Sequence, residues 1–318
     1  MIAHPAIAGG RRRDSRRELP LSKKPATPAG TIAELVNQYH SRRPVRAWSL
    51  IITLYGDAIV PRGGSLWLGS LIDIMALFKI DAGHVRTAMS RLTADGWLSR
   101  EKAGRNSYYR LTRREEGVFN AATRRIYFAH APAFDGRLRL ALLGPGVGDR
   151  PSARPALERA GFAALTATAY VAFGDASPPL PDIDGVFLVH ADASDDVHAL
   201  AAAAWKLAPL AAAYRAFIDR FAPLDATLDA GNAVGDADAL VARVLLIHEF
   251  RRIVLRDPGL PAALLPADWP GSLARDMTAR IYRRLLEASE RFLDAHAQDR
   301  TGPIPGPDVG FRRRFSPS

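Results

Sequence analysis

Apolar residues recur at three- and four-residue intervals over much of the first 95 residues, which is the spacing of one face of an α-helix. The pattern predicts four helices, at residues 31–40, 45–55, 65–78 and 82–95. Asp81 is a favourable N-cap for the fourth helix, and Gly96 favours its end. Two short strand-like stretches follow, 97–102 and 107–112, joined by a turn-forming Ala-Gly-Arg-Asn sequence. Helices followed by a basic hairpin in this order predict a winged helix-turn-helix unit.

The fourth predicted helix has two chemically different faces. At 100° per residue its apolar side chains fall on one side, and these are Val85, Ala88, Met89 and Leu92. The opposite side carries Thr87 and Ser90, flanked by Arg86 and Arg91. A DNA major groove of ~12 Å accepts one helix, and hydroxyl and guanidinium groups bind base edges and phosphates. We therefore expect this helix to enter the major groove, while the spacing leaves open whether Arg86 or Arg91 contacts guanine.

Hydrogen-bond donors and cations also gather at or near the tip of the predicted hairpin. The side chains that we expect to contact the DNA backbone or the minor groove are Lys102, Arg105, Asn106, Ser107, Tyr108 and Arg110. Any one of them alone is typical of a solvated surface. Together with the fourth helix, in a positively charged segment, the set favours DNA contact.

The distribution of charge supports this interpretation. The chain has 318 residues and a formal net charge of +10. Residues 1–47 hold 10 basic and 3 acidic side chains and residues 48–126 hold 12 and 7, whereas residues 127–318 hold 21 and 23. All of the positive excess therefore lies in the first 126 residues, as expected for a nucleic-acid-binding end joined to a sensing or assembly module. A solubility tail beside an ordinary domain is the alternative.

The remaining segments complete a predicted α+β fold with an N-terminal winged helix-turn-helix domain, a central ferredoxin-like domain and a helical C-terminal domain. Residues 1–30 combine arginine clusters and prolines with few large apolar residues, which predicts a disordered basic arm. The DNA-binding domain with a linker helix would span 31–130, and strand, helix and two strands in ferredoxin-like order would span 131–193. Residues 194–300 predict a helical effector and dimerisation domain, and 301–318 a loose tail.

Several classes of function are disfavoured by what the sequence lacks. Without cysteine there is no disulfide, thiolate zinc site or cysteine nucleophile, which fits a reducing cytoplasm. As a DNA-binding protein it is expected to be cytoplasmic and associated with the nucleoid. No apolar stretch reaches the length of a membrane helix. His248-Glu249 lacks the second histidine of a zinc-protease motif because Arg252 stands there, and Gly144 to Asp149 lacks the third glycine of a dinucleotide loop. We expect neither an enzyme nor a bound metal or cofactor.

Several longer runs resemble one family over about residues 45–297. In the amino-terminal half these runs are WLGSLI at 67–72, VRTAMSRL at 85–92, GWL at 96–98 and GRNSYYRLT at 104–112. In the carboxyl-terminal half they are HEFRR at 248–252 and LLPADWPG at 264–271. In order and spacing they resemble the PaaX repressors of phenylacetic acid degradation, and the second of the two carboxyl-terminal runs is much more specific than any generic helix-turn-helix pattern.

The resemblance implies a dimeric transcriptional repressor that binds a near-palindromic operator in double-stranded DNA and is released by phenylacetyl-coenzyme A. An acyl-coenzyme A effector needs cations for its phosphates and an apolar slot for its acyl group. The candidate effector-binding cations are Arg251, Arg252 and Arg256, and the candidates for the slot are Trp269 and Tyr282.

Two other functions stay open at this point. The family's middle domain is similar to a small CRISPR-associated nuclease whose metal-binding acid lies near the end of its first strand. Here the predicted strand at 137–143 contains no acid, and a metal-dependent nuclease would depend on Asp135 just before it. A non-specific architectural DNA-binding protein would instead bind an operator and a random duplex equally.

Overall fold

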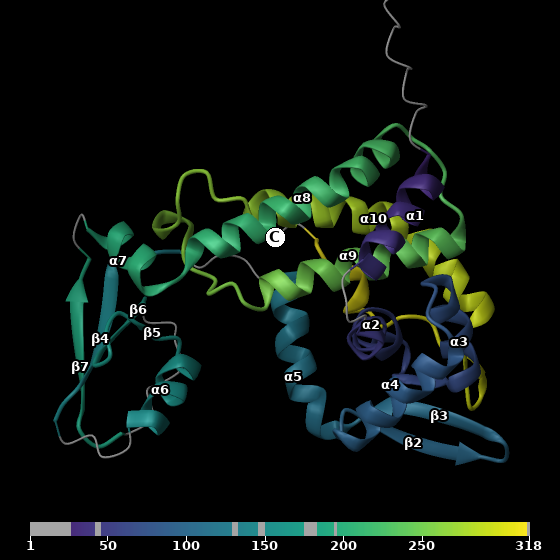
Figure 1. The fold of residues 1–318 in the computed structure, drawn as a ribbon, viewed down its shortest axis with the longest axis horizontal. Helices are drawn as coiled ribbons and strands as arrows, with labels where there is room; N and C mark the ends of the chain where they lie inside the picture. Colours follow the sequence, from purple (N-terminus) through teal and green to yellow (C-terminus); the bar gives the residue numbers. More distant parts are fainter. Residues whose placement is uncertain are drawn as a thin grey trace, which may run out of the picture.

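The computed structural model describes residues 27–41, 46–128, 133–145, 150–174, 183–193 and 196–316. Figure 1 shows a small sheet unit beside a larger helical body, and the hairpin of the larger body lies at its lower edge. The predicted α+β class is confirmed. Of the predicted basic arm at 1–30, residues 1–26 lie outside the described residues, and a helix already begins at Pro28.

The first part of the helical body combines short helices with a three-stranded sheet. Its helices are α1 (Pro28–Ser41), α2 (Ala47–Leu54), the π-helical turn η1 (Tyr55–Ile59), the 3-10 turn η2 (Val60–Arg62), α3 (Leu68–Leu77), α4 (Ala82–Ala94), α5 (Arg113–Thr123) and the π-helical turn η3 (Arg124–Phe128). Its strands are β1 (Ser65–Trp67), β2 (Leu98–Ala103) and β3 (Asn106–Leu111), in the order β1-β3-β2. The four predicted helices and the hairpin are present.

One local prediction was wrong. Residues 65–67, expected to begin a helix at Ser65, form β1 and pair antiparallel with β3, so that Leu66 lies opposite Tyr109. Helical periodicity is a signal between near neighbours in sequence, and it cannot reveal a pairing with a strand far along the chain. The third helix therefore begins at Leu68, after this strand.

The sheet unit occupies the middle of the chain. Its elements are β4 (Arg137–Leu143), α6 (Arg150–Arg159), β5 (Ala163–Ala164), β6 (Ala169–Phe173) and β7 (Val186–Asp192). The strands are antiparallel, in the order β5-β6-β4-β7. Helix α6 places Leu157 in a small core with Ala141 and Phe162, separate from the core of the helical body. The predicted order of strand, helix and two strands is present, with β5 as an additional short strand.

Long helices form the last third of the chain. The elements are α7 (Val197–Ala204), α8 (Leu207–Asp229), α9 (Asp236–Val254), the 3-10 turn η4 (Ala262–Leu264), α10 (Gly271–His296), β8 (Gln298–Asp299), β9 (Gly302–Pro303) and the 3-10 turn η5 (Phe311–Arg313). Residues 301–318 were predicted to form a loose tail, and this prediction was wrong for residues 301–316, which pack against the rest of the protein. Phe311 and Phe315 are only 3% and 7% exposed, because their rings pack into the helical body. The neighbouring Arg314 is held there as well, since it forms an ion pair with the buried carboxylate of Asp57.

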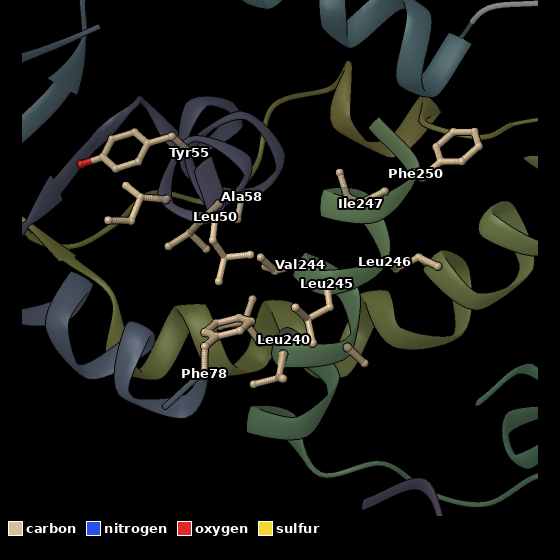
Figure 2. Packing of buried hydrophobic residues seen from close by; sticks show 14 of the residues in the cluster. Leu50, Tyr55, Ala58, Phe78, Leu240, Val244, Leu245, Leu246, Ile247 and Phe250 are labelled. Atoms are coloured by element: carbon tan, nitrogen blue, oxygen red, sulfur yellow. The ribbon is translucent and has the colours of Figure 1, made fainter. Parts of the chain in front are cut away.

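The two ends of the chain share one hydrophobic core. Helix α9 is buried on almost every side, and its Leu240, Val244 and Phe250 lie in the same cluster as Leu50 of α2 and Phe78 beside α3 (Figure 2). The predicted DNA-binding segment and the predicted C-terminal helices are therefore packed as one body. The position of α4, which packs against α2, is fixed by this body.

Candidate nucleic-acid interface

Helix α4 presents a polar face to solvent because its apolar face is fully used in packing. Asp81 caps the helix, since its Oδ1 accepts a hydrogen bond from the backbone N–H of His84 at 3.0 Å. The apolar positions Val85, Ala88, Met89 and Leu92 are buried. On the opposite side, the side chains of Arg86, Thr87, Ser90 and Arg91 are exposed. The two faces of this helix are as the sequence predicted.

The β2–β3 hairpin lies beside α4 and carries most of the other predicted contacts. Its turn places Gly104 at a φ of 60°, which glycine adopts without strain. The predicted contacts that are exposed are Lys102, Arg105, Asn106 and Arg110. Ser107 and Tyr108 are instead 7% and 9% exposed, because β3 is the central strand of its sheet and Tyr108 lies opposite Trp67 of β1.

A cleft of about 660 Å³ separates α4 from the hairpin, and we call it the basic cleft. Arg86 and Ser90 line it from α4, and Arg100, Arg105 and Ser107 line it from the hairpin. Within the described part of the chain, none of these three arginines forms an ion pair with a carboxylate. The cleft is therefore a concave surface with uncompensated positive charge, which suits a phosphate backbone.

Arg100 is a cleft residue that the sequence analysis missed. Its Nε and Nη2 donate hydrogen bonds to Oγ of Ser107 at 3.1 and 2.7 Å, which fixes the guanidinium group over the strand pair. Strand alternation places Arg100 on the same side of the hairpin as Lys102. That alternation was visible in the sequence, but only the packing of the hairpin shows that this side faces α4.

The structure also distinguishes the two arginines of α4. Arg91 forms an ion pair with Asp95 at 3.5 Å, and its guanidinium carbon lies 5.6 Å from the centre of the Trp48 ring. Arg86 lines the basic cleft. Of the two candidates, Arg86 is therefore the one that faces the concave surface.

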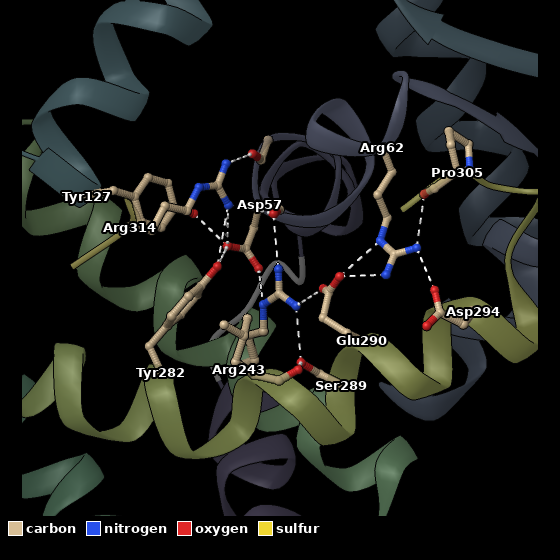
Figure 3. A network of polar contacts seen from close by, with 12 residues as sticks. Asp57, Arg62, Tyr127, Arg243, Tyr282, Ser289, Glu290, Asp294, Pro305 and Arg314 are labelled. Atoms are coloured by element: carbon tan, nitrogen blue, oxygen red, sulfur yellow. Dashed lines mark hydrogen bonds and ion pairs between the residues drawn. The ribbon is translucent and has the colours of Figure 1, made fainter. Parts of the chain in front are cut away.

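A buried polar network connects this interface with the C-terminal helices (Figure 3). Asp57 lies in η1, directly after α2, and its Oδ2 forms an ion pair with Nε of Arg243 on α9 at 2.7 Å. Its Oδ1 accepts hydrogen bonds from the hydroxyls of Tyr127 at 2.7 Å and Tyr282 at 3.0 Å, and from Nη1 of Arg314 at 3.2 Å. The side chains of Asp57 and Arg243 are both 0% exposed. Segments far apart in sequence thus meet at one carboxylate.

Glu290 of α10 extends the network towards η2. Its Oε1 pairs with Nη1 of Arg243 at 2.6 Å, and its Oε2 pairs with Nη2 of Arg62 at 2.5 Å. Asp294 also pairs with Arg62, at 2.8 Å. The three arginines Arg62, Arg243 and Arg314 are thereby matched by three carboxylates, which is the condition under which buried charge is tolerated.

The protonation of the network follows from its burial. Burial raises the pKa of Tyr282 to about 12, although the Arg243 cation opposes the rise. Burial and the charge of Asp57 raise the pKa of Tyr127. Desolvation disfavours the charged form of Arg243, but Asp57, Tyr282 and Glu290 together outweigh it, and the pKa of Arg243 is raised. Both phenols therefore remain hydrogen-bond donors and Arg243 remains a cation at neutral pH.

The predicted effector-binding residues do not converge on one site. Tyr282 belongs to the buried network. Arg251 donates hydrogen bonds to Oγ1 of Thr53 at 2.7 Å and to Oγ of Ser49 at 2.8 Å, which holds α9 against α2. Burial lowers the pKa of Arg251 to about 10. Because these contacts occupy Arg251 and Tyr282, both have structural partners within the protein.

The other three predicted effector residues lie nearer the surface. Arg252 is exposed and pairs with Glu249 at 3.7 Å, and Trp269 packs edge-on against Tyr214 with ring centres 5.9 Å apart. Arg256 lines a cavity of about 240 Å³ with Trp205, Lys206, Leu207, Pro209, Leu210 and Pro258. We call this space the seam cavity, since it lies beside the contact between the sheet unit and the helical body.

The acid on which a nuclease would depend has a structural partner. Oδ1 of Asp135 accepts a hydrogen bond from the backbone N–H of Arg137 at 2.9 Å, which shapes the entry to β4. Within the described ranges, histidine, aspartate and glutamate side chains do not gather in a group of three or more that would hold a metal ion. Among the same residues, no helix is both long and apolar enough to cross a bilayer.

An outward polar helix face beside a basic hairpin defines a candidate DNA-binding protein, and comparison with known proteins gives its family. Residues 46–115 match the family described as PaaX-like protein, and residues 205–295 match the PaaX-like protein C-terminal domain. The chain is 36% identical over 292 residues to "Transcriptional repressor PaaX" of Escherichia coli, covering 86% of this chain and 90% of that protein. The chain therefore belongs to the PaaX-like family, as the motif runs predicted.

A solved structure is also similar in part. It is the uncharacterized protein Rv0674 from Mycobacterium tuberculosis, with 23% sequence identity and a TM-score of 0.46. The similarity covers 69% of this chain and 90% of that one.

Proposed function

We propose that this protein is a transcriptional repressor of phenylacetate catabolism genes that acts at the nucleoid, binding its operator through α4 and the β2–β3 hairpin. The observation that carries the proposal is the exposed face of α4, where Arg86, Thr87 and Ser90 stand beside the basic cleft. The Escherichia coli relative, which is named a transcriptional repressor, supports it. The effector that releases the repressor is an aryl-acyl-coenzyme A, and phenylacetyl-coenzyme A is our candidate.

We infer a winged helix-turn-helix for the DNA-binding part and a ferredoxin-like fold for the sheet unit. The β1-β3-β2 sheet beside α4 supports the first. The antiparallel order with β4 between β6 and β7 supports the second. In this arrangement α4 is the helix that enters the major groove, and the hairpin contacts the adjacent backbone or minor groove.

We further propose that the repressor is a homodimer on a near-palindromic operator, with half-sites one helical turn, ~34 Å, apart. Among the strands that the structure describes, β7 lies at the edge of its sheet, and Phe187, Leu188 and Val189 on it are 61%, 40% and 40% exposed. Apolar side chains on an unpaired edge strand favour association with a second chain.

The test compares full-length variants on two DNA duplexes of equal length, one from the promoter of the catabolic genes and one of random sequence. Fluorescence anisotropy measures both affinities at a fixed salt concentration. Combining Arg86→Ala with Thr87→Ala should lower the preference for the promoter about 10- to 100-fold, because base contacts are lost. Arg283→Ala is the matched control, since this exposed arginine on α10 donates from Nε to the Ala279 carbonyl and lies outside the cleft.

Three results would contradict the proposal. A wild-type protein with equal affinity for both duplexes would be a non-specific architectural DNA-binding protein. An unchanged preference in the double variant would remove α4 from recognition. Cleavage of DNA that requires magnesium or manganese and is lost in Asp135→Asn would favour the nuclease.

A further inference from the structure

The seam cavity lies where the last third of the chain meets the sheet unit. Trp205 and Lys206 precede α8, and Arg256 follows the end of α9. The ring of Trp205 lies 5.3 Å from the ring of Phe173, the last residue of β6. One wall of the cavity is thus formed by a side chain that also contacts the sheet unit, and ligand pockets are common at such junctions.

The chemistry of the cavity walls is divided. Leu207 and Leu210 are buried and Trp205 is half-buried, which gives an apolar side. Lys206 and Arg256 are exposed at the rim, and among the described residues neither forms an ion pair. Nε of Arg256 donates to the backbone oxygen of Arg252 at 2.6 Å, which holds the guanidinium group in place. Two uncompensated cations beside an apolar wall suit a molecule with an apolar end and phosphate groups.

The size of the cavity limits how such a molecule would lie. At about 240 Å³ it is smaller than the roughly 300–1,000 Å³ of pockets that enclose most of a drug-sized ligand. It therefore has room for one end of a coenzyme A thioester, while the rest of the carrier would extend over the rim. Since the pantetheine arm separates the thioester from the phosphates, the carrier would fold back along the rim to bring its phosphates to Lys206 and Arg256, which are exposed there.

We propose that the seam cavity is the effector site of this repressor. The aromatic acyl end of the thioester packs against Trp205 and the adjoining leucines, and Lys206 and Arg256 bind phosphates of the carrier. The inference rests on the proposed function, because it names the site at which the effector would bind to release the repressor from its operator. Of the five effector-binding residues predicted from the sequence, this site keeps Arg256 alone, and in place of the other four it has residues that line the cavity.

Direct contacts connect this cavity to the linker after the hairpin. Asp257 stands between the lining residues Arg256 and Pro258, and its backbone oxygen accepts a hydrogen bond from Nη2 of Arg125 in η3. The same nitrogen donates to the Val254 oxygen at 3.2 Å. A ligand that shifts the turn at 256–258 therefore acts on η3.

From η3 the contacts continue to the DNA-binding helices. Arg275 of α10 donates to the backbone oxygen of Arg125 at 2.9 Å, which holds the linker on the helical body. Tyr127, two residues further, donates to Asp57 in η1, which directly follows α2. Helix α2 in turn packs against α4, which completes the route from the cavity to the exposed α4 face. The route includes side-chain contacts that substitution can break, so it can be tested.

Binding is tested first without DNA, so that the result does not depend on the operator. Isothermal titration calorimetry of the full-length protein uses phenylacetyl-coenzyme A, coenzyme A and phenylacetate separately. We expect Lys206→Ala and Arg256→Ala each to weaken thioester binding about 10-fold, as one charge-assisted hydrogen bond is lost. Arg283→Ala is the control, because it removes an exposed helical arginine with the same kind of backbone contact, and it should bind like wild type.

The outcomes separate this inference from the proposed function. Thioester binding within two-fold of wild type in both Lys206→Ala and Arg256→Ala would overturn the site while leaving operator recognition intact. Absence of binding to wild type would also overturn it. If wild type lacks operator preference but binds the thioester through Arg256, the site stands and the proposed function fails.

The connection to DNA is tested with Arg125→Gln, with Arg124→Gln as its control. Arg124 is the exposed neighbour in η3. Arg125→Gln should bind the thioester like wild type. Saturating thioester should, however, lower the operator affinity of this variant by a factor at least about 5-fold smaller than in wild type. Release as complete as in wild type would overturn the route through η3.

Discussion

Replacing Asp57 with asparagine removes the central charge of the buried network but nearly keeps its shape. The guanidinium groups of Arg243 and Arg314 lie 2.7 and 3.2 Å from the carboxylate oxygens, and both side chains are buried. Without the charge, Arg243 keeps Glu290, whereas the partners left to Arg314 are neutral, such as the backbone oxygen of Gly56. Removing one partner of a buried ion pair costs about 3–5 kcal/mol, because the other charge stays buried.

Urea unfolding followed by circular dichroism would measure this loss. Glu287→Gln is the control, since Glu287 is 91% exposed in its pair with Arg291 and should change nothing measurable. Asp57→Asn combined with Arg314→Leu should lose less than the sum of the two single variants, because both remove the same interaction. An Asp57→Asn protein within about 1 kcal/mol of wild type would refute the reasoning, given the expected 3–5 kcal/mol.

Three further predictions concern other parts of the molecule. Above pH 10 the free energy of unfolding should fall, because Tyr282 and Tyr39, whose pKa values are raised to about 12, stay protonated in the folded state while unfolded phenols ionise. Arg251, whose pKa is lowered to about 10, opposes this fall. Tyr282→Phe should reduce the fall in the free energy of unfolding between pH 10 and 12 by about 1.4 kcal/mol per pH unit, measured by denaturant titrations. Phe311→Ala should destabilise the fold by about 3–5 kcal/mol in urea unfolding, whereas Val309→Ala, at a residue 75% exposed, should not. Arg105→Ala should weaken promoter and random DNA alike and reduce the salt slope of binding by about 1.

Features set by near neighbours in sequence could be predicted, and α4 is the clearest example. Its capping aspartate, the buried row with Val85 and Met89 and the exposed row with Thr87 all follow from helical spacing. The family could also be predicted, because runs such as LLPADWPG carry more information than a periodic pattern. By the same reasoning, the hairpin was found from its turn residues.

Features that join distant segments could not be predicted in this way. The strand β1 exists because β3 pairs with it, and Arg100 faces the cleft because of where the hairpin packs. The carboxylate of Asp57 is stabilised by four side chains that are distant in sequence, those of Tyr127, Arg243, Tyr282 and Arg314. The sequence did contain one sign of it, an acid directly after the apolar run of α2, where burial of a charge requires partners.

The shared core constrains how an effector would release DNA. Because α9 packs against α2, and Arg251 ties it to α2 while Arg243 ties it to η1, the exposed face of α4 cannot easily turn relative to the C-terminal helices. The contact with the sheet unit is of a different kind, since it consists of a small cluster in which Phe173 and Trp205 meet Leu260 and Leu264. A ligand beside Trp205 would act at this smaller contact, where less buried area opposes movement, and also on η3, which Arg125 ties to the turn at 256–258 and which precedes the sheet unit in the chain. If the sheet unit joins two copies, a small rotation there would change the distance between their α4 helices and so their fit to two half-sites.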